Sequence, residues 1–589
     1  MDLKEIQQTP IWDLYEKGRN YHRRKNWYTE TNRNYNFFMG DQWDGAKLGD
    51  VEPVVKNFIK PIVKYKVSVI HDNLYAVNYS SQNYENRQFQ KEATRYCDLL
   101  NGYIRRLWEK DKLDFYGRRV TKDAAINGEG IMYTYLDKEK MTPIHEVVKK
   151  VDVYYGNEND DNIQTQPYIL IRKRLPVINA RELAESEGVS EEKLKLIVGD
   201  NDTIEESGED AKEELDDMVT IIYKMYKSKG TVHYAMATRW CDITDEVDTG
   251  LSLYPLAHFI WEEKEGSARG EGEVKPLIPN QIEVNRTEMR RVLTVKEQAY
   301  PMKVIDATKI SNPEAINTVG GTIRTNGAPV DDVHKIVGTI PPAQMSSDVK
   351  LLQDDLIQMS RELAGAGDTA TGAVNPEDAS GRAILAVQQA SQAPMTEQKE
   401  GYKNFLEDLA RIDLEYLVVY SEDGVNMEET VTDPMTGEEY VQMVNVPQTV
   451  LKQLQAQVKI DITPKGVYDR FAMEQTMENF LMNGFFNPQR VAEFEAYVKA
   501  LPDDSVAPKP DLLEGIENIK KTQQQIARIN AQAQLMQQRA QQFLMQDVDS
   551  QASQISEAQQ QLMMENQFAQ QEAELDGQVA EEVENVDDN

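Results

Sequence analysis

The feature that most constrains this fold is a helical pattern that stops and later resumes. Apolar residues recur at helical spacing over residues 277–296 and again over residues 346–363. Between them, residues 300–342 contain turn signals and short strand-like runs at 322–325 and 335–337. This order predicts two neighbouring helices that carry a small α/β module inserted between them.

A long segment of small residues, 364–381, follows the second helix. Its glycines give the backbone freedom, and its threonines and asparagine offer uncharged polar groups. We predict that Gly365 stops the preceding helix and that a further helix begins at Pro376, runs to about Tyr420 and bends at Pro394. A loop of this length is either functional or disordered. Two packed helices joined by a plain connector remain the alternative.

The chain is strongly acidic, because 65 lysines and arginines stand against 99 aspartates and glutamates, a net charge of -34. This balance argues against a protein that grips nucleic acid by neutralising phosphates, but it suits one that lets DNA pass with little friction. Cys97 and Cys241 lie far apart and predict neither a disulfide framework nor a zinc site. Residues 1–10 carry no export signal, and no apolar run reaches the ~20 residues that span a bilayer. We expect no membrane span.

Residues 1–276 mix helical and strand-like stretches without a βαβ rhythm, which indicates an α+β domain. The aromatic and basic residues 21–43 are predicted to pack against a neighbouring element, with arginines paired to acids. Stacking on nucleotides is the alternative. The elements expected in this part are helices over 3–40, over 53–77 with a bend at Pro61, and over 84–108, strands at 131–135 and 168–171, and a hairpin of 220–226 with 233–238.

Beyond the long helix, we expect a hairpin that turns about residues 433–437 and a strand at 458–462. Residues 512–543 are predicted to be helical, but glutamine and alanine dominate them, so this helix would be marginal alone. Packing against copies of itself would supply the missing burial. Residues 572–589 contain eight acids and no base, which indicates a solvated tail.

Motifs for nucleotide, metal or nucleophilic chemistry are missing from the sequence. There is no G-x-x-x-x-G-K-[ST], and Gly365-Ala366-Gly367 does not follow a strand as a dinucleotide site requires. The six histidines show no ligand spacing, so structural roles are the simpler interpretation. Pro502-Asp503-Asp504 with Lys509 faintly matches nuclease carboxylate and lysine sites, but the nearby prolines favour a linker. We predict no catalytic residue, no cofactor and no metal.

The order of elements resembles the portal protein of tailed bacteriophages over most of residues 10–500. No single motif is specific, and the likeness rests on their order and spacing. The motifs that carry it are Asn36-Phe-Phe-Met-Gly-Asp-Gln-Trp43, Asp123-Ala-Ala-Ile-Asn-Gly128, Gln281-Ile-Glu-Val-Asn285, and Thr371-Gly372 through Ser380-Gly-Arg-Ala-Ile384.

The resemblance implies a mainly helical α+β fold divided into wing, stem, clip and crown. A long helical extension at the C-terminus is typical of podovirus-like portals. The implied parts are a wing at 1–276, stem helices at 277–299 and 344–363, a clip at 300–343, a tunnel loop at 364–380, a long kinked helix with returning wing strands at 381–465, crown or barrel helices at 466–545, and a glutamine-rich, acidic, disordered tail at 546–589.

The resemblance also implies a function and partners. Such a protein forms a ring of about twelve copies at one capsid vertex of the virion, after assembly in the host cytoplasm. Double-stranded DNA passes through its channel without sequence specificity during packaging and ejection. The implied protein partners are the terminase large subunit, neck or tail adaptor proteins, and the major capsid and scaffolding proteins.

Three groups of site residues follow from the resemblance and the charge pattern. The tunnel loop would face DNA with Gly365, Gly367, Asp368, Thr369, Thr371, Gly372 and Asn375. The stem bases Arg286, Arg290, Arg291 and Lys296 would pair with acids of a neighbouring subunit such as Asp354 and Asp355, or face phosphate. The clip would contact terminase or tail through Arg324, Asn326, Gly327, Asp331 and Asp332.

Two other classes of protein remain open. One is an internal capsid scaffold, or another virion protein, that assembles through its glutamine-rich helices without a channel. The other is a metal-dependent nucleic-acid-processing enzyme with an unrecognised carboxylate site.

Overall fold

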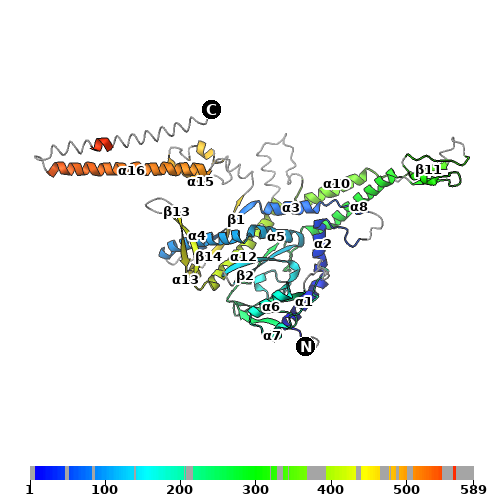
Figure 1. Ribbon diagram of the computed structural model, residues 1–589, viewed down its shortest axis with the longest axis horizontal. Helices are drawn as coiled ribbons and strands as arrows, with labels where there is room; N and C mark the ends of the chain where they lie inside the picture. Colours follow the sequence, from blue (N-terminus) through cyan, green and yellow to red (C-terminus); the bar gives the residue numbers. More distant parts are fainter. Residues whose placement is uncertain are drawn as a thin grey trace. The chain divides into compact units, whose positions relative to one another are not determined.

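The computed structural model divides into two compact units, Met1–Gly466 and Val467–Asn589, and each is described by itself (Figure 1). The structure describes the chain except for residues 1–6, 47–51, 82–86, 138–140, 205, 207–216, 301, 319, 328–335, 342–343, 368–392, 433–438, 455, 465–475, 478, 484, 486–489, 501–508, 547–560 and 566–589.

The first unit begins with two helices, α1 (Pro10–Arg24) and α2 (Trp27–Met39), where one helix over 3–40 was expected. Thr9 caps α1 by accepting a hydrogen bond from the Trp12 backbone amide, and the left-handed Asn26 separates the two helices. Within the stretch 21–43, Tyr28, Phe37 and Phe38 are buried, and Arg23 pairs with Glu206 at 3.3 Å. The prediction that the aromatic residues of this stretch pack is confirmed, and the predicted pairing of its arginines with acids is confirmed for Arg23.

Antiparallel sheets build the middle of this unit. One sheet has the order β4-β5-β6-β7-β8, and a second has the order β3-β2-β9. The strands predicted at 131–135 and 168–171 and the hairpin of 220–226 with 233–238 are confirmed. The elements are β2 (Glu129–Asp137), β3 (Thr142–Val148), β4 (Val153–Tyr155), β5 (Ile169–Pro176), α6 (Val177–Ser186), α7 (Glu191–Leu194), β6 (Met218–Ser228), β7 (Thr231–Ala237), β8 (Asp242–Asp248) and β9 (Leu256–Ile260).

The helix predicted over 53–77 is wrong in extent. Helix α3 covers only Ile59–Ile70, and the next residues form strand β1 (Asn73–Ser81). Pro61 lies in the first turn of α3, where proline is tolerated, so it causes no bend. Strand β1 pairs with β14 (Ala456–Pro464), nearly 400 residues away, and no local pattern reveals such a partner.

Helix α12 (Thr396–Tyr420) runs through the core of the unit (Figure 1). Its predicted apolar face, Tyr402, Phe405, Leu409, Ile412 and Tyr416, is buried. The expected bend at Pro394 corresponds to a 3-10 turn, Ala393–Met395, and the part of the predicted helix before it lies outside the described residues. Around α12 lie α4 (Arg87–Lys110), α5 (Leu113–Asn127), the hairpin of β12 (Val425–Thr432) with β13 (Glu439–Val446), and α13 (Gln448–Leu454).

The second unit contains α15 (Val491–Ala500) and the long α16 (Lys509–Gln546). The two helices pack through buried Val498 and Ile516, and Lys520 pairs with Glu495. The predicted helix at 512–543 is confirmed. Further along α16, the large apolar side chains Ile519, Ile526, Ile529 and Met536 are exposed.

Candidate functional site

Two helices leave the body of the first unit side by side and carry a small module at their far ends (Figure 1). They are α8 (Val274–Ala299), which contains Pro279 near its start, and α10 (Asp348–Leu363). Among its described residues, the module between them contains β10 (Lys303–Ile305), paired with β11 (Val337–Thr339), and the 3-10 turn Pro313–Asn317. The helix pair with an inserted module, predicted from the periodicity, is therefore present.

Polar side chains line the contact between α8 and α10. Gln353 is buried, donates a 2.7 Å hydrogen bond to Glu288 Oε2, and accepts one of 2.8 Å from Arg291. Ser360 is also buried, and its Oγ accepts a hydrogen bond from Asn280 Nδ2 at 2.9 Å. Such bonds have fixed partners, so they set the register of the two helices in a way that interchangeable apolar contacts would not.

The apolar residues of α10 mostly face away from α8. The predicted stripe of Val349, Leu352, Leu356, Met359 and Leu363 is present, but only Leu356 packs against the core cluster. Leu352 is 53% exposed, Met359 60% and Leu363 77%. A row of large exposed apolar side chains on a regular helix indicates a surface that is covered by a partner.

The four bases predicted on this helix pair lie on α8 and have acidic partners within the chain. Arg286 and Arg290 lie 3.7 and 3.6 Å from the carboxylate of Glu283. Arg291 pairs with Glu288 at 3.0 Å, and Lys296 pairs with Glu52 at 2.9 Å. Exposed pairs of this kind contribute about 0–1 kcal/mol, so the bases can exchange these partners for other anions at little cost.

A network of buried amides ties α8 to the N-terminal segment. Gln281 accepts a hydrogen bond from the Phe58 backbone amide at 3.0 Å and donates one to the Lys56 carbonyl at 2.9 Å. Asn285 accepts a hydrogen bond from the Lys56 amide at 3.0 Å and donates one to Gln42 at 2.5 Å. Gln42 and Asn285 belong to two of the quoted sequence motifs, which the fold brings into direct contact.

A buried cluster of charges surrounds Arg269, in the segment just before α8. Arg269 donates to Glu129 at 2.9 Å, to Glu158 at 3.0 Å and to the Val153 carbonyl at 2.7 Å. Its guanidinium also lies 4.5 Å from the ring centre of Tyr155. Gly128, with φ of +97°, lets the chain pass so close to Gly270 that a Cβ atom would meet the Gly270 carbonyl oxygen at 2.2 Å.

Burial and neighbouring charges shift the pKa values of the two glutamates and the histidine in this cluster. Burial acts to raise the pKa of Glu129, but Arg269, Lys150 and His258 outweigh it and hold that pKa well below its usual range. At Glu158, burial again acts to raise the pKa, but Arg269 and His22 outweigh it and lower this pKa to about 2. Burial lowers the pKa of His22 to about 4, so this imidazole is neutral at pH 7. The guanidinium of Arg269 and the two carboxylates are paired with one another, so the cluster serves as an anchor.

A second buried charged group surrounds His145 of β3. Its Nε2 lies 2.9 Å from Asp413 Oδ1 on α12, and its Nδ1 lies 3.3 Å from Asp111 Oδ2. Trp108 donates to the other oxygen of Asp413 at 2.8 Å. Burial lowers the pKa of His145, but the two aspartates outweigh this effect and raise it to about 9. The imidazole is therefore charged at pH 7 and holds β3 to α12.

The root of the predicted tunnel loop is well defined at the end of α10. Gly365 has φ of +66° and donates to the Glu362 carbonyl at 2.9 Å, and Ala366 donates to the Arg361 carbonyl at 2.8 Å. These two bonds form a Schellman motif, so the prediction that Gly365 stops this helix is confirmed. A Cβ atom at Gly365 would lie 3.5 Å from Pro394, so the chain returns beside the point where it leaves.

Of the predicted loop residues, Gly365 and Gly367 are described. Gly367 lines a pocket of 250 Å³ together with Lys56, Asp354, Ile357, Gln358 and Arg361. The remaining predicted loop residues, Asp368, Thr369, Thr371, Gly372 and Asn375, lie outside the described residues.

In the module at the far end, Arg324 and Asn326 are exposed and Gly327 is left-handed, with φ of +67°. Asn326 donates its backbone amide to the Lys309 carbonyl at 2.9 Å. Asp331 and Asp332 lie outside the described residues. The sequence interpretation missed the exposed apolar side chains of this module, Tyr300, Met302, Val304 and Ile340. Tyr300, Met302 and Val304 occupy alternate positions of one short run, and this spacing was the available signal.

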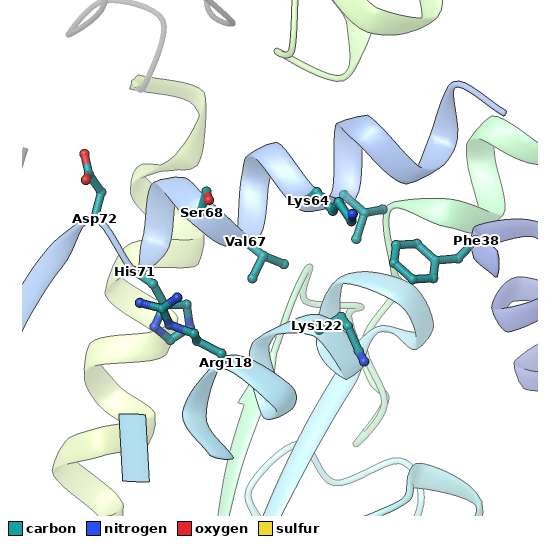
Figure 2. A pocket seen from close by; sticks show the side chains of 9 residues that line it. Phe38, Lys64, Val67, Ser68, His71, Asp72, Arg118 and Lys122 are labelled. Carbon is teal, nitrogen blue, oxygen red and sulfur yellow. The ribbon is translucent and has the colours of Figure 1, made fainter. Parts of the chain in front are cut away.

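A further pocket, of 390 Å³, lies between α3 and α5 and was not predicted. Figure 2 shows Lys64 and Val67 on α3 opposite Arg118 and Lys122 on α5, with Phe38 of α2 at one end. His71 and Asp72 lie at the other end. The lining is basic at its rim and apolar at its floor, which is unusual on so acidic a chain.

Within the described residues, no group of three or more His, Cys, Asp or Glu side chains is arranged to hold a metal ion. None of the helices in that part of the chain is both long and apolar enough to cross a membrane.

Comparison with known protein families gives a match over residues 177–576 to a model described as phage P22-like portal protein. The match covers more than half of the chain, including α8, α10, the module between them and the segment after Gly365. No curated protein matches the chain.

Proposed function

This chain belongs to the phage P22-like portal protein family, and we propose that its copies close into a ring at one capsid vertex, through which double-stranded DNA enters and leaves. The ring is a non-enzymatic conduit in this proposal. It is also the platform on which the terminase large subunit docks during packaging and on which neck or tail adaptors dock afterwards.

The observation that carries the proposal is the outer face of α10. A ring needs two different complementary surfaces on one chain, because each copy contacts the next in a head-to-tail manner. The exposed Leu352, Met359 and Leu363 provide one such surface on a helix whose opposite face is already packed on α8. We expect this face to be covered by a neighbouring copy.

The segment rooted at Gly365 supports a channel. The described residues on its two sides lie close together, because a Cβ atom at Gly365 would lie 3.5 Å from Pro394. The sequence 368–381 contains only three charged residues, all acidic, which suits steric and polar contact with a passing duplex better than tight binding. We propose that this segment faces DNA through its threonines and glycines, together with Asp368 and Asn375.

The stem bases are proposed to pair with acids of the neighbouring subunit. Arg286 and Arg290 share one carboxylate, Glu283, so at least one of them is available for a further acid. Asp354, which forms no salt bridge among the described residues, is the candidate on the next copy. Phosphate contact is the other possibility for these bases.

A charge-reversal experiment separates these two possibilities. If subunit pairing is the role, Arg290→Glu weakens assembly and Asp354→Arg restores it. If phosphate contact is the role, assembly is unchanged and packaging falls.

The module at the far end of the helix pair is proposed to dock terminase and then the neck or tail adaptors. Exposed apolar residues (Tyr300, Met302 and Val304) and exposed polar residues (Arg324 and Asn326) both occur in this inserted module, and Asp331 and Asp332 belong to the same segment of the sequence. Mixed apolar and polar surfaces of this kind suit partners that exchange. Met302→Ser is expected to weaken terminase binding in a pull-down with intact rings.

Helix α16 favours a second candidate function. Its exposed residues Ile519, Ile526, Ile529 and Met536 recur at spacings of seven and three, as in a coiled-coil seam. The same seam could build the barrel of a portal or the elongated oligomer of an internal scaffold. Deleting residues 509–589 separates the two: a portal still forms rings, whereas a scaffold protein becomes monomeric.

Electron microscopy of purified full-length protein in negative stain tests the main proposal. Rings with a central hole are expected, and elongated particles without a hole at high protein concentration would contradict it. Replacing residues 365–372 by a rigid helical sequence is expected to leave rings intact while capsids fail to package or retain DNA. A scrambled loop of the same composition is the matched control and should package normally.

A further inference from the structure

We propose that the basic pocket between α3 and α5 is the socket for α10 of a second copy of this chain, which seats its apolar stripe on the pocket floor and its acidic row on the pocket rim. This inference rests on the proposed function, in which a neighbouring copy covers the outer face of α10, and it names the surface of that copy that does so.

The pocket has the properties of a receptor for an acidic, amphipathic helix. Its rim carries Lys64, Arg118 and Lys122, and its floor is formed by Phe38, Val63 and Val67. None of the three rim bases forms a salt bridge with a described residue, although the chain has 34 more acids than bases. Bases left unpaired on such a chain indicate that their anions come from outside the subunit.

Two helices fix the shape of this socket. Lys64 and Val67 lie one turn apart on α3, and Arg118 and Lys122 lie one turn apart on α5 (Figure 2). The ring of His71 is held by a 2.9 Å hydrogen bond to Thr121 of α5, which ties the two helices together at one end. Asp72 is the single acid among the nine lining residues. The volume of 390 Å³ accommodates one or two large apolar side chains.

Helix α10 has the complementary pattern on its exposed face. Leu352, Met359 and Leu363 form the apolar stripe, because spacings of seven and four residues return to nearly the same side of a helix. Asp348, Asp355 and Glu362, spaced by seven, form a row directly beside that stripe. All three acids are exposed and form no salt bridge within the part of the chain that the structure describes.

The exposed face of α10 therefore matches the pocket both in the kinds of side chain and in their arrangement. An apolar stripe flanked by acids fits an apolar floor flanked by bases, which is the helix-in-groove mode of recognition. Socket and helix occupy different surfaces of one chain, so the contact is heterologous and propagates from copy to copy. DNA phosphate would satisfy the bases equally well, but it would leave the apolar floor and the α10 stripe uncovered, so the observations favour the helix.

The test is a charge swap in the full-length chain, read out as the protein concentration at which half of the chains are oligomeric. Reversing the rim with Arg118→Glu and Lys122→Glu, or reversing the row with Asp355→Lys and Glu362→Lys, is expected to raise that concentration by about tenfold or more. Combining the four changes is expected to restore it to within about threefold of wild type. The matched control is Arg119→Glu, an exposed base of α5 that does not line the pocket and should have no effect.

Mass photometry and sedimentation velocity give this readout, and circular dichroism of the monomers checks that each variant is folded. Met359→Ser provides a second test of the contact, because it removes an exposed apolar side chain and leaves the buried core unchanged. It should weaken assembly in the wild-type background.

The outcomes separate this inference from the proposed function. Closed rings that are insensitive to the reversals would overturn the socket and leave the ring standing. Open oligomers that are sensitive to them would support the socket and contradict the ring. Reversals that leave assembly unchanged but lower the salt-dependent binding of a duplex of about 30 base pairs would assign the pocket to phosphate and overturn the proposal.

Discussion

Replacing Arg269 by methionine should destabilise the first unit by about 3–5 kcal/mol at pH 7, which is the usual cost of leaving buried charges without their partner. Arg269 is 3% exposed and binds both Glu129, which is buried, and Glu158, whose side chain is 10% exposed. Methionine fills a similar volume, so the loss reports on charge rather than on a cavity. Lys150 and His258 remain beside Glu129, which keeps the loss at the lower end of the range.

The pH dependence gives this prediction its sharper form. In the wild type, the depressed pKa values of Glu129 and Glu158 mean that their stabilisation is present above the unfolded-state pKa near 4.5 and is lost as pH falls toward about 2. In the variant the carboxylates lose their main cation, and their folded-state pKa values rise. As pH falls, protonation neutralises the unpaired carboxylates of the variant. The difference in free energy of unfolding between the two proteins should therefore shrink from pH 7 to pH 4.

The assay is urea unfolding of the unassembled chain, followed by tryptophan fluorescence, since Trp27 lies over the Arg269 guanidinium. Arg411→Met is the matched control, because Arg411 is half-exposed and pairs with Asp408 on the same helix, so its loss should cost under about 1 kcal/mol. If Arg269→Met lowers the free energy of unfolding equally at pH 7 and pH 4, the account based on buried charge is refuted. If it lowers the free energy of unfolding by less than Arg411→Met does, the anchoring role is refuted.

Three further predictions concern the joints of the candidate site. Asn285→Ala removes the link between Gln42 and the Lys56 amide and should cost about 1–3 kcal/mol, seen as faster hydrogen exchange of residues 52–58 by mass spectrometry; unchanged exchange there would contradict the joint. Gly365→Ala should cost about 1 kcal/mol, because the left-handed backbone disfavours a side chain although Pro394 leaves room for one, and a thermal melt with no shift would show that the helix ends differently. His145 has a pKa raised to about 9, so its stabilisation is present below the unfolded-state pKa near 6.5 and is lost as pH rises through about 9. His145→Gln should therefore flatten the fall in stability over that window, and an unchanged pH profile would remove His145 as its cause.

Local patterns were sufficient where the relevant physics is local. The stop of α10 follows from one glycine, the apolar face of α12 from its spacing, and the hairpin of β6 with β7 from alternation around a turn. The helix predicted over 53–77 failed because the segment after residue 70 pairs with β14, and a local window holds no information about a strand so distant in the chain.

For the candidate site too, the sequence predicted the features that depend on local patterns and missed those that depend on tertiary packing. The helix pair, its inserted module and the root of the loop could be predicted, since periodicity and turn residues encode them. The sequence did not predict that α10 packs on α8 through Gln353 and Ser360 while its leucines face outward, because the stripe alone does not say which face the fold will cover. Nor did it predict the basic pocket, whose members come from three helices.

The sequence by itself determined the elements, the acidic surface, the absence of nucleotide motifs and the order of parts that places the chain in its family. The tertiary structure alone decided which charges are buried and paired, as at Arg269, and which have no salt bridge to any described residue, as at Lys64, Arg118 and Lys122. The physical reason is that periodicity and turn preference act over a few residues, whereas burial and ion pairing depend on which distant segments meet.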